Sequence, residues 1–324
     1  MFAFSPLSSS RDLSTPVDMN PLTRRCTMST PPWMVSLHGG HSGQFCDHAV
    51  GSLEEVLEAA VAAGFTTFGI SEHAPRLGTQ YLYDKEIELG WDVAHLEKLF
   101  DDYATTSAEL VEAFADRLTV LRGFEAEAVP TDRYKELMLG YRERYGFEFM
   151  IGSVHHVDDI SIDGPMHQFQ QAMEGRGGLE PLAIAYYEAV IAMIEALQPE
   201  VVGHLDLIRK NGVHVGPVDT PAIREVAVAA LEVVRDHGCV LDLNTAGYRK
   251  GLKTPYPAPW IIQRATDMGI GFCFGDDSHG PEQVGAGMEA SRRYLLEQGV
   301  THISAPSRQD GGLVWHKVPL ADAP

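Results

Sequence analysis

The stretch "DTPAIREVAVAALEVVRDHGCVLDLN" (residues 219–244) contains one complete helix-to-strand unit, and the rest of the chain can be interpreted from it. Thr220 is a typical N-cap, Pro221 suits the first helical position and Gly238 suits a C-terminal stop, so a helix is predicted between them. The apolar run at 239–243 follows directly and predicts a strand. Asn244 comes next, so a polar side chain stands at the carboxyl end of this strand.

The same alternation of helices and short strands continues through the chain from Trp33 onward. A second clear helix begins at a capping box formed by Ser52 and Glu55 and ends at Gly64. Strands are predicted at residues 33–37, 66–70, 118–123, 147–152, 200–203, 239–243 and 269–275. Strands that alternate with helices favour a parallel sheet, and seven of them suit a closed or nearly closed α/β barrel.

The length of 324 residues is large for an ordinary domain but common for an α/β barrel. We therefore expect one barrel domain over residues 33–324. Residues 1–32 are rich in Ser, Thr and Pro and lack the apolar core of a secretory signal, so a mobile tail is expected there. A true start at Met28 or Met34 is the alternative interpretation of this segment.

Composition and charge narrow the function classes. Lys and Arg number 25 against 45 Asp and Glu, and the net charge of −20 disfavours nucleic-acid and membrane-surface partners. No apolar run approaches the roughly 20 residues of a membrane span. The four cysteines include no Cys-x-x-Cys pair, which favours a reducing, cytoplasmic location. The oligomeric state is not predicted.

Histidine and acidic residues follow nearly every predicted strand. They are His38 and His41; Glu72 and His73; Glu125 and Glu127; His155 and His156; His204 and Asp206; and Asp276, Asp277 and His279. A single histidine after a strand is usually an ordinary polar residue, but the repeated pattern favours metal ligation because the carboxyl ends of barrel strands share one face. Imidazole with carboxylate suits Zn, Mn or Fe, and several carboxylates can bridge ions. We predict a multinuclear metal site, with His48 interpreted as an ordinary histidine.

A metal site of this kind suits the hydrolysis of phosphate esters by water that the ions activate. No Gly-x-Ser-x-Gly elbow and no phosphate-binding loop lysine motif is present to suggest another mechanism. Arg249, Arg76 and Arg209, in that order, are the predicted phosphate-binding cations, and His156 is a further candidate for substrate binding. Loops 74–92 and 157–178 are the segments expected to select the substrate; Asp158, Asp159 and Asp163 in the second could meet a cationic amine or an imidazolium.

Seven motifs together resemble the polymerase-and-histidinol-phosphatase (PHP) family, and within it the monofunctional histidinol-phosphatases. They are "HSGQFCDHA", "SEHAPR", "GFEAE", "IGSVHHVDDISIDG", "GHLDL", "LDLNTAGYRK" and "GDDSHGPEQVG", and they span most of the chain after Met34. The resemblance implies a distorted TIM-like barrel of seven β/α units with its metal site at the carboxyl ends of the strands. It also implies two or three divalent ions, Zn, Fe or Mn, and hydrolysis of L-histidinol phosphate in histidine biosynthesis. Another small or nucleotide-derived phosphate ester is the alternative substrate.

The resemblance also implies the ligands. The metal ligands it implies are His38, His41, Glu72, His73, Glu125, His155, His204, Asp277 and His279. Glu125 is expected to bridge two ions, and Asp277 or His279 is the candidate for proton transfer. The usual His-x-His motif is here His38-Gly-Gly-His41, so the first ligand depends on how the two glycines are folded.

Overall fold

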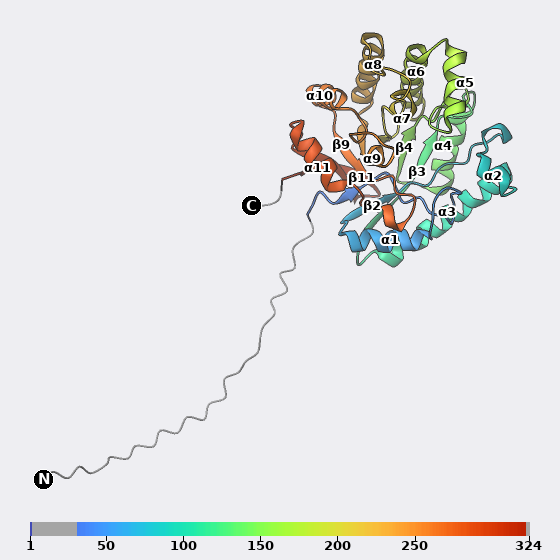
Figure 1. Cartoon of the computed structure of the whole chain (residues 1–324). Coiled ribbons are helices and arrows are strands. Elements are labelled where there is room, and N and C mark those ends of the chain that lie inside the picture. The colour runs from blue at the N-terminus through green and yellow to red at the C-terminus, as the bar shows by residue number, and fades with distance from the viewer. Residues whose placement is uncertain (2–30, 322–324) are drawn as a thin grey trace.

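The computed structural model describes Met1 and residues 31–321. Apart from Met1, Pro31 and Pro32, the tail predicted at 1–32 lies outside the described residues. In Figure 1 helices surround a central set of strands. Of the helices in residues 31–321, none by itself is long and apolar enough to cross a membrane; α5 (Met166–Arg176) and α6 (Leu179–Leu197) reach that length and composition only as a pair bent by 94°.

All seven predicted strands are present and form one parallel sheet. They are β1 (Val35–Ser36), β2 (Thr67–Ile70), β3 (Thr119–Glu127), β4 (Phe149–Ser153), β7 (Val201–Val202), β8 (Val240–Asn244) and β9 (Phe272–Gly275), hydrogen-bonded in that order. The two edges also meet, because the N–H of Leu37 donates to the carbonyl of Phe274 at 2.8 Å and His38 forms a parallel bridge with Gly275. The prediction of a nearly closed α/β barrel is confirmed.

Helices follow the strands of this barrel. Besides α5 and α6 they are α1 (Leu53–Ala63), α2 (Asp84–Glu88), α3 (Val93–Phe114), α4 (Tyr134–Tyr145), α7 (Arg209–Gly212), α8 (Pro221–His237), α9 (Ala246–Arg249), α10 (Pro259–Asp267) and α11 (Met288–Glu297), with 3-10 turns η1 (Thr79–Tyr81) and η2 (Pro281–Gln283). The longer helices cover the outside of the barrel, and the short α7 and α9 lie at its carboxyl end. The predicted caps are present. Thr220 accepts from the N–H of Ile223 at the start of α8, and Gly238 ends it with a left-handed φ of 69°. Such caps determine the residues at which each helix begins and ends, and so where the next strand can start.

Two antiparallel hairpins lie outside the predicted strand set. The first joins β5 (His156–Val157) to β6 (Ile160–Ser161), and the second joins β10 (His302–Gln309) to β11 (Gly312–Pro319). Side chains of the second hairpin, among them Trp315, pack against the apolar barrel interior around Val35 and Leu121. These residues lie early in their strands, so the hairpin covers the amino end of the barrel. The carboxyl end, where the histidines lie, is the end left for a site.

Candidate metal centre

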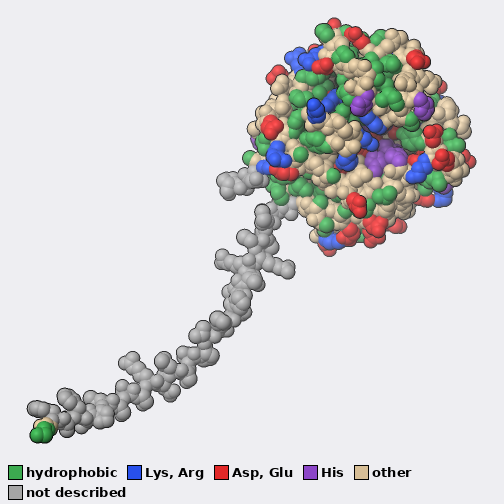
Figure 2. Space-filling view, in the orientation of Figure 1, with side chains coloured by type: hydrophobic (Ala, Val, Ile, Leu, Met, Phe, Trp, Pro, Cys, Tyr) green, Lys and Arg blue, Asp and Glu red, His purple; other side chains and the backbone are tan. Residues whose placement is uncertain are grey.

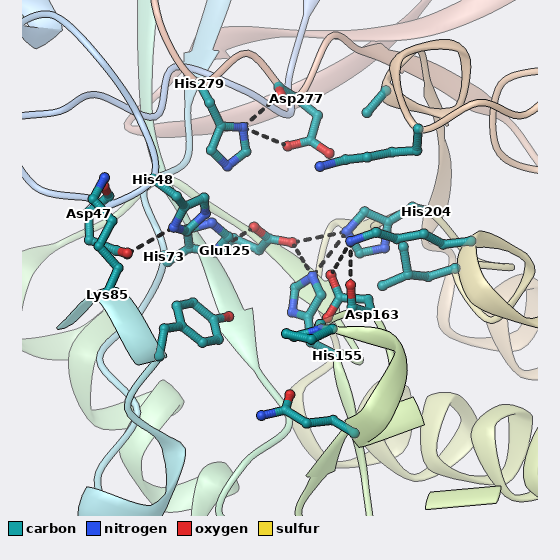
Figure 3. A pocket seen from close by; sticks show the side chains of 18 of the residues that line it. Asp47, His48, His73, Lys85, Glu125, His155, Asp163, His204, Asp277 and His279 are labelled. Carbon is teal, nitrogen blue, oxygen red and sulfur yellow. Dashed lines mark hydrogen bonds and ion pairs between the residues drawn. The ribbon is translucent and has the colours of Figure 1, made fainter. Parts of the chain in front are cut away.

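Glu125, on β3, lies at the centre of the carboxyl end of the barrel. Its Oε1 atom lies 3.2 Å from Nε2 of His204 and 3.3 Å from Nε2 of His38. Its Oε2 atom lies 2.9 Å from Nδ1 of His73 and 3.9 Å from Nε2 of His41. Figure 3 shows Glu125 between His73 on one side and His204 on the other. Each carboxylate oxygen therefore faces a different set of imidazoles, as a carboxylate that bridges two ions must.

A second carboxylate, Asp277, completes the centre from the strand opposite. Its N–H donates to the carbonyl of His38 at 2.7 Å, which holds the turn after β9 against the end of β1. Its Oδ1 atom lies 3.7 Å from Nε2 of His41 and 3.6 Å from Nδ1 of His279. His155 joins from β4, with its Nε2 atom 3.3 Å from Nε2 of His204. Residues spread over six strand ends are thus brought together.

Among residues 31–321, four groups of side chains have donor atoms close enough together to hold a metal ion. Three are buried or nearly so and share members: His38–Glu125–His204, His38–His41–Asp277 and His41–His73–Glu125. The fourth, Cys46–His48–His73–His279, lies farther out and is partly exposed. Because neighbouring groups share Glu125, His38, His41 or His73, the arrangement is that of a cluster rather than of separate sites.

Unpartnered nitrogens test whether these residues fit divalent ions. Within the described part of the chain, Nε2 of His38 and Nε2 of His41 are buried and have no hydrogen-bond partner. The other nitrogen of each ring is held by a carboxylate, since Nδ1 of His38 donates to Asp242 at 2.7 Å and Nδ1 of His41 donates to Glu72 at 3.2 Å. Each Nε2 atom is therefore the ring nitrogen that remains for a metal ion. A buried set of imidazole and carboxylate donors fits Zn, Mn or Fe.

Glu72 itself lies behind His41. It accepts from His41 and from the N–H of Ser42 at 3.2 Å, and it belongs to none of the four groups. This geometry gives Glu72 the part of a ligand's partner, whereas the sequence led us to expect a ligand. Asp242, inside β8, plays the same part for His38 and was not predicted. The signal for it in the sequence was an acid within the apolar run at 239–243.

His48 is the histidine whose position the sequence interpretation missed. It was expected to be an ordinary residue, but the structure places it with His73 and His279 in the outer group. Its Nδ1 atom donates to Oδ1 of Asp47 at 2.9 Å, which leaves Nε2 for another partner. Its place in the same loop as His41 was the available signal.

The charges in the centre stabilise one another. Burial alone would raise the pKa of Glu125, but the imidazoles of His38, His73 and His155 lower it well below its usual range. Glu125 is therefore ionised and able to coordinate at neutral pH. Burial also opposes the charge of Asp277, and His38, His279 and His41 outweigh it, so the pKa of this carboxyl is lowered as well. Both carboxylates are ready to bind cations.

A pocket of about 350 Å³ opens above the centre. Glu125, Asp277 and His279 are in its lining, and Figure 2 shows histidines at the bottom of a hollow with basic side chains beside them. Its wall contains three lysines, Lys85, Lys210 and Lys250. This volume suits a small molecule rather than a polymer.

The three predicted phosphate-binding arginines are not in this lining. Arg76 is buried and pairs with Glu86 at 2.5 Å while stacking over Tyr83. The guanidinium of Arg209 donates to Asp206 at 3.0 Å. That of Arg249 donates at 2.7 Å to the backbone carbonyls of Asp276 and Asp277. His156, the fourth predicted substrate residue, lines a separate pocket of about 170 Å³.

Comparisons with known proteins agree with this geometry. A model of the PHP domain matches residues 38–246. The "Probable histidinol-phosphatase" of Schizosaccharomyces pombe is 33% identical over 277 residues, covering 83% of this chain and 88% of that protein. The "Histidinol-phosphatase" of Saccharomyces cerevisiae is 27% identical over 293 residues, covering 80% of this chain and 88% of that protein. The structure of histidinol phosphate phosphatase from Lactococcus lactis, complexed with zinc, L-histidinol and phosphate, shares the fold, with a TM-score of 0.65 at 17% identity over 86% of this chain and 98% of that one.

Proposed function

Because the chain belongs to the PHP domain family, we propose that it is a metal-dependent phosphatase that hydrolyses L-histidinol phosphate to L-histidinol and phosphate. The observation that carries this proposal is the position of Glu125, whose two oxygens face different imidazoles at the base of a small pocket. The names of the S. pombe and S. cerevisiae relatives support the choice of substrate. We infer that the reaction belongs to histidine biosynthesis, as the resemblance to histidinol-phosphatases implies.

The donor groups support hydrolysis without a covalent intermediate. Divalent ions, when held by these groups, would lower the pKa of bound water to near neutrality and would neutralise charge on the phosphoryl oxygens. The chain's own part is to place those ions and the ester together. Asp277 and His279 line the pocket and remain the residues that we propose for proton transfer. Nδ1 of His279 donates to the carbonyl of Asp277 at 3.0 Å, so its Nε2 atom carries the lone pair.

Lys250 is the cation that we propose for the phosphoryl group. It follows α9 at the pocket wall, where burial and the neighbouring Lys210 lower its pKa and Asp277 opposes that effect. Its ammonium forms no ion pair or hydrogen bond with the residues in 31–321. Lys210, by contrast, is already paired with Asp163 at 3.3 Å. An ammonium group near Asp277 that has no partner among the described residues can bind an anionic ester that enters the pocket.

Asp163 is the acidic residue best placed to meet a cationic amine. Of the three aspartates predicted for this role, Asp158 is paired with Arg176 and Asp159 accepts from Thr131, both away from the pocket lining. Asp163 lines the pocket itself, and although its Oδ2 atom is paired with Lys210, its two carboxylate oxygens can accept from a second ammonium group. Burial opposes its charge, but Lys210, His155 and His156 lower its pKa, so it stays anionic. A phosphate ester that also carries an ammonium group therefore suits this pocket.

The net charge and the pocket size favour a small-molecule substrate. At −20 the chain repels nucleic acid and anionic lipid, and we infer that neither is a partner. We also expect a cytoplasmic location, where the four cysteines stay reduced.

A substrate panel tests the function. The purified protein, with its metal content measured, is assayed against L-histidinol phosphate and a set of sugar and nucleotide phosphates. We expect kcat/KM for L-histidinol phosphate to exceed that for the others by about 100-fold or more, a difference of about 2.7 kcal/mol in transition-state binding. A chelator should abolish the activity. Equal rates across the panel would support the alternative, another small or nucleotide-derived ester, and metal without phosphatase activity would support a binding module.

Replacing Lys250 with methionine is expected to lower kcat/KM by about 10²–10³-fold, because the phosphoryl group loses a charged partner in a site with little water. Metal content should not change, since Lys250 belongs to no metal-holding group. Lys253→Met, an exposed neighbour in the same loop, is the control and should behave as the parent protein. Activity retained in Lys250→Met would assign phosphate binding to another cation.

A further inference from the structure

Glu127 is a buried carboxylate that contacts two histidines of the centre from behind. It ends β3, two residues after Glu125, and it is fully buried. Its Oε2 atom accepts from Nδ1 of His155 at 2.9 Å. Its Oε1 atom lies 3.4 Å from Nδ1 of His73 and has no other partner in the described part of the chain. Nδ1 of His73 also lies 2.9 Å from Oε2 of Glu125, so two carboxylates face this nitrogen, and Glu127 is the one that faces Nδ1 of both rings.

The Nε2 atoms of His155 and His73 point to different parts of the cluster. Nε2 of His155 lies 3.5 Å from Oε1 of Glu125 and 3.3 Å from His204, in what we call the inner group (Glu125, His155 and His204). His73 turns Nδ1 toward Glu125 and Glu127, which leaves Nε2 for the outer group (His48, His73 and His279, beside Cys46). Glu127 thus stands between two metal positions and belongs to neither.

The other two rear carboxylates serve one ring each. Among the histidine rings Glu72 accepts only from His41, although it also accepts from the backbone N–H of His73 at 3.2 Å, and Asp242 accepts only from the ring of His38. A carboxylate at Nδ1 keeps the proton on that nitrogen, orients the ring and makes Nε2 a better donor to a metal. Only a group with two equivalent acceptor oxygens can do this for two rings at once, and Glu127 has that chemistry.

We propose that Glu127 is a positioning residue shared by the inner and outer groups, so that metal affinity at the two positions depends on the same side chain. This inference deepens the metal site and rests on that part of the proposed function, but it does not depend on the substrate. A glutamine at this position offers one acceptor oxygen and presents an amide N–H₂ to the second ring. Both positions should weaken together.

Metal titration of Glu127→Gln tests the proposal. The metal-free protein is titrated with Zn²⁺ against a chelator of known affinity, and the number of equivalents retained is measured by elemental analysis. We expect two equivalents to bind about 10- to 100-fold more weakly than in the parent protein. Glu72→Gln is the matched control, because it removes the partner of His41 alone, and it should weaken fewer equivalents than Glu127→Gln.

The outcomes separate coupling from simple loss of a ligand partner. Weakening of one equivalent only in Glu127→Gln would overturn the shared role, and unchanged affinities would overturn any positioning role. If Glu127→Gln does not fold in the metal-free state, as judged by thermal unfolding, Glu127→Asp replaces it; this variant keeps both oxygens but withdraws them, and the same paired weakening is expected. If the parent protein binds metal but does not hydrolyse L-histidinol phosphate, the proposed substrate is wrong, and the inference about Glu127 is unaffected.

Discussion

Glutamine in place of Glu125 is expected to remove at least one metal equivalent and to lower kcat/KM by at least about 10³-fold. The carboxylate contributes one oxygen toward His38 and His204 and the other toward His73 and His41. A neutral amide has a single coordinating oxygen, so it cannot bridge two ions. It also removes the negative charge that partly neutralises a buried cation cluster.

Elemental analysis and steady-state assays of the same preparation would measure both effects of this change. Glu58→Gln is the control, because Glu58 is an exposed carboxylate whose partner is Arg117 at the surface, and it should leave metal content and rate unchanged. Full metal content with the parent rate in Glu125→Gln would show that Glu125 does not bridge ions. A loss of metal without loss of rate would separate the cluster from catalysis.

The seven strands could be predicted because local signals agree with the tertiary structure. Around β8, Thr220 and Gly238 define α8 by local hydrogen bonds, and the apolar run that follows has only the barrel in which to bury itself. The hairpin of β10 and β11 follows a different rule. Its strands are largely exposed and contact with the amino end of the barrel stabilises it, but its two-residue turn, Asp310-Gly311, was a local hairpin signal that we did not use.

Side-chain direction explains which site residues could be predicted. On a strand, neighbours point to opposite sides, so Glu125 and Glu127 share the inner face with Asp242 and Asn244 on β8, whereas adjacent Glu72 and His73 diverge. The sequence shows that Glu72 and His73 both follow a strand, but it does not show which of the two side chains points toward the metal centre.

The basic pairs Arg209-Lys210 and Arg249-Lys250 show the same limit in helical segments. Successive residues in a helix turn by about 100°, so only one of each pair can point into the pocket. The structure places both lysines in the lining, while both arginines bind protein groups. It could be predicted that a basic residue lies just beyond a strand end. The direction in which its side chain points depends on the short helices α7 and α9.

Alanine at Gly39 is expected to destabilise the metal-free protein by about 3 kcal/mol and to reduce its metal content. Gly39 has a φ of +155°, and a Cβ atom there would lie 2.2 Å from Oδ1 of Asp276, too close for any real contact. At Gly40, with a φ of +78°, a Cβ atom would lie 2.9 Å from Cγ2 of Ile70. The Gly39-Gly40 segment therefore passes closely between the ends of β2 and β9.

This step also explains why two histidines three residues apart can serve one centre. Nε2 of His38 reaches Oε1 of Glu125 at 3.3 Å, and Nε2 of His41 faces Oε2 of the same side chain at 3.9 Å. The extra residue relative to a His-x-His motif is absorbed by backbone conformations that only glycine adopts easily. Any side chain at position 39 must push Asp276 aside, and the turn that carries Asp277 would move with it.

Denaturant unfolding of the metal-free proteins measures the predicted loss, with Gly90→Ala as the matched control. Gly90 also has a left-handed φ, +74°, but a Cβ atom there would meet nothing within 4 Å. Its replacement should cost only the backbone strain of about 1 kcal/mol. The difference between the two variants isolates the clash at the strand ends. Equal stability of Gly39→Ala and Gly90→Ala, with metal content unchanged, would mean that the Gly-Gly step does not constrain His38 and His41.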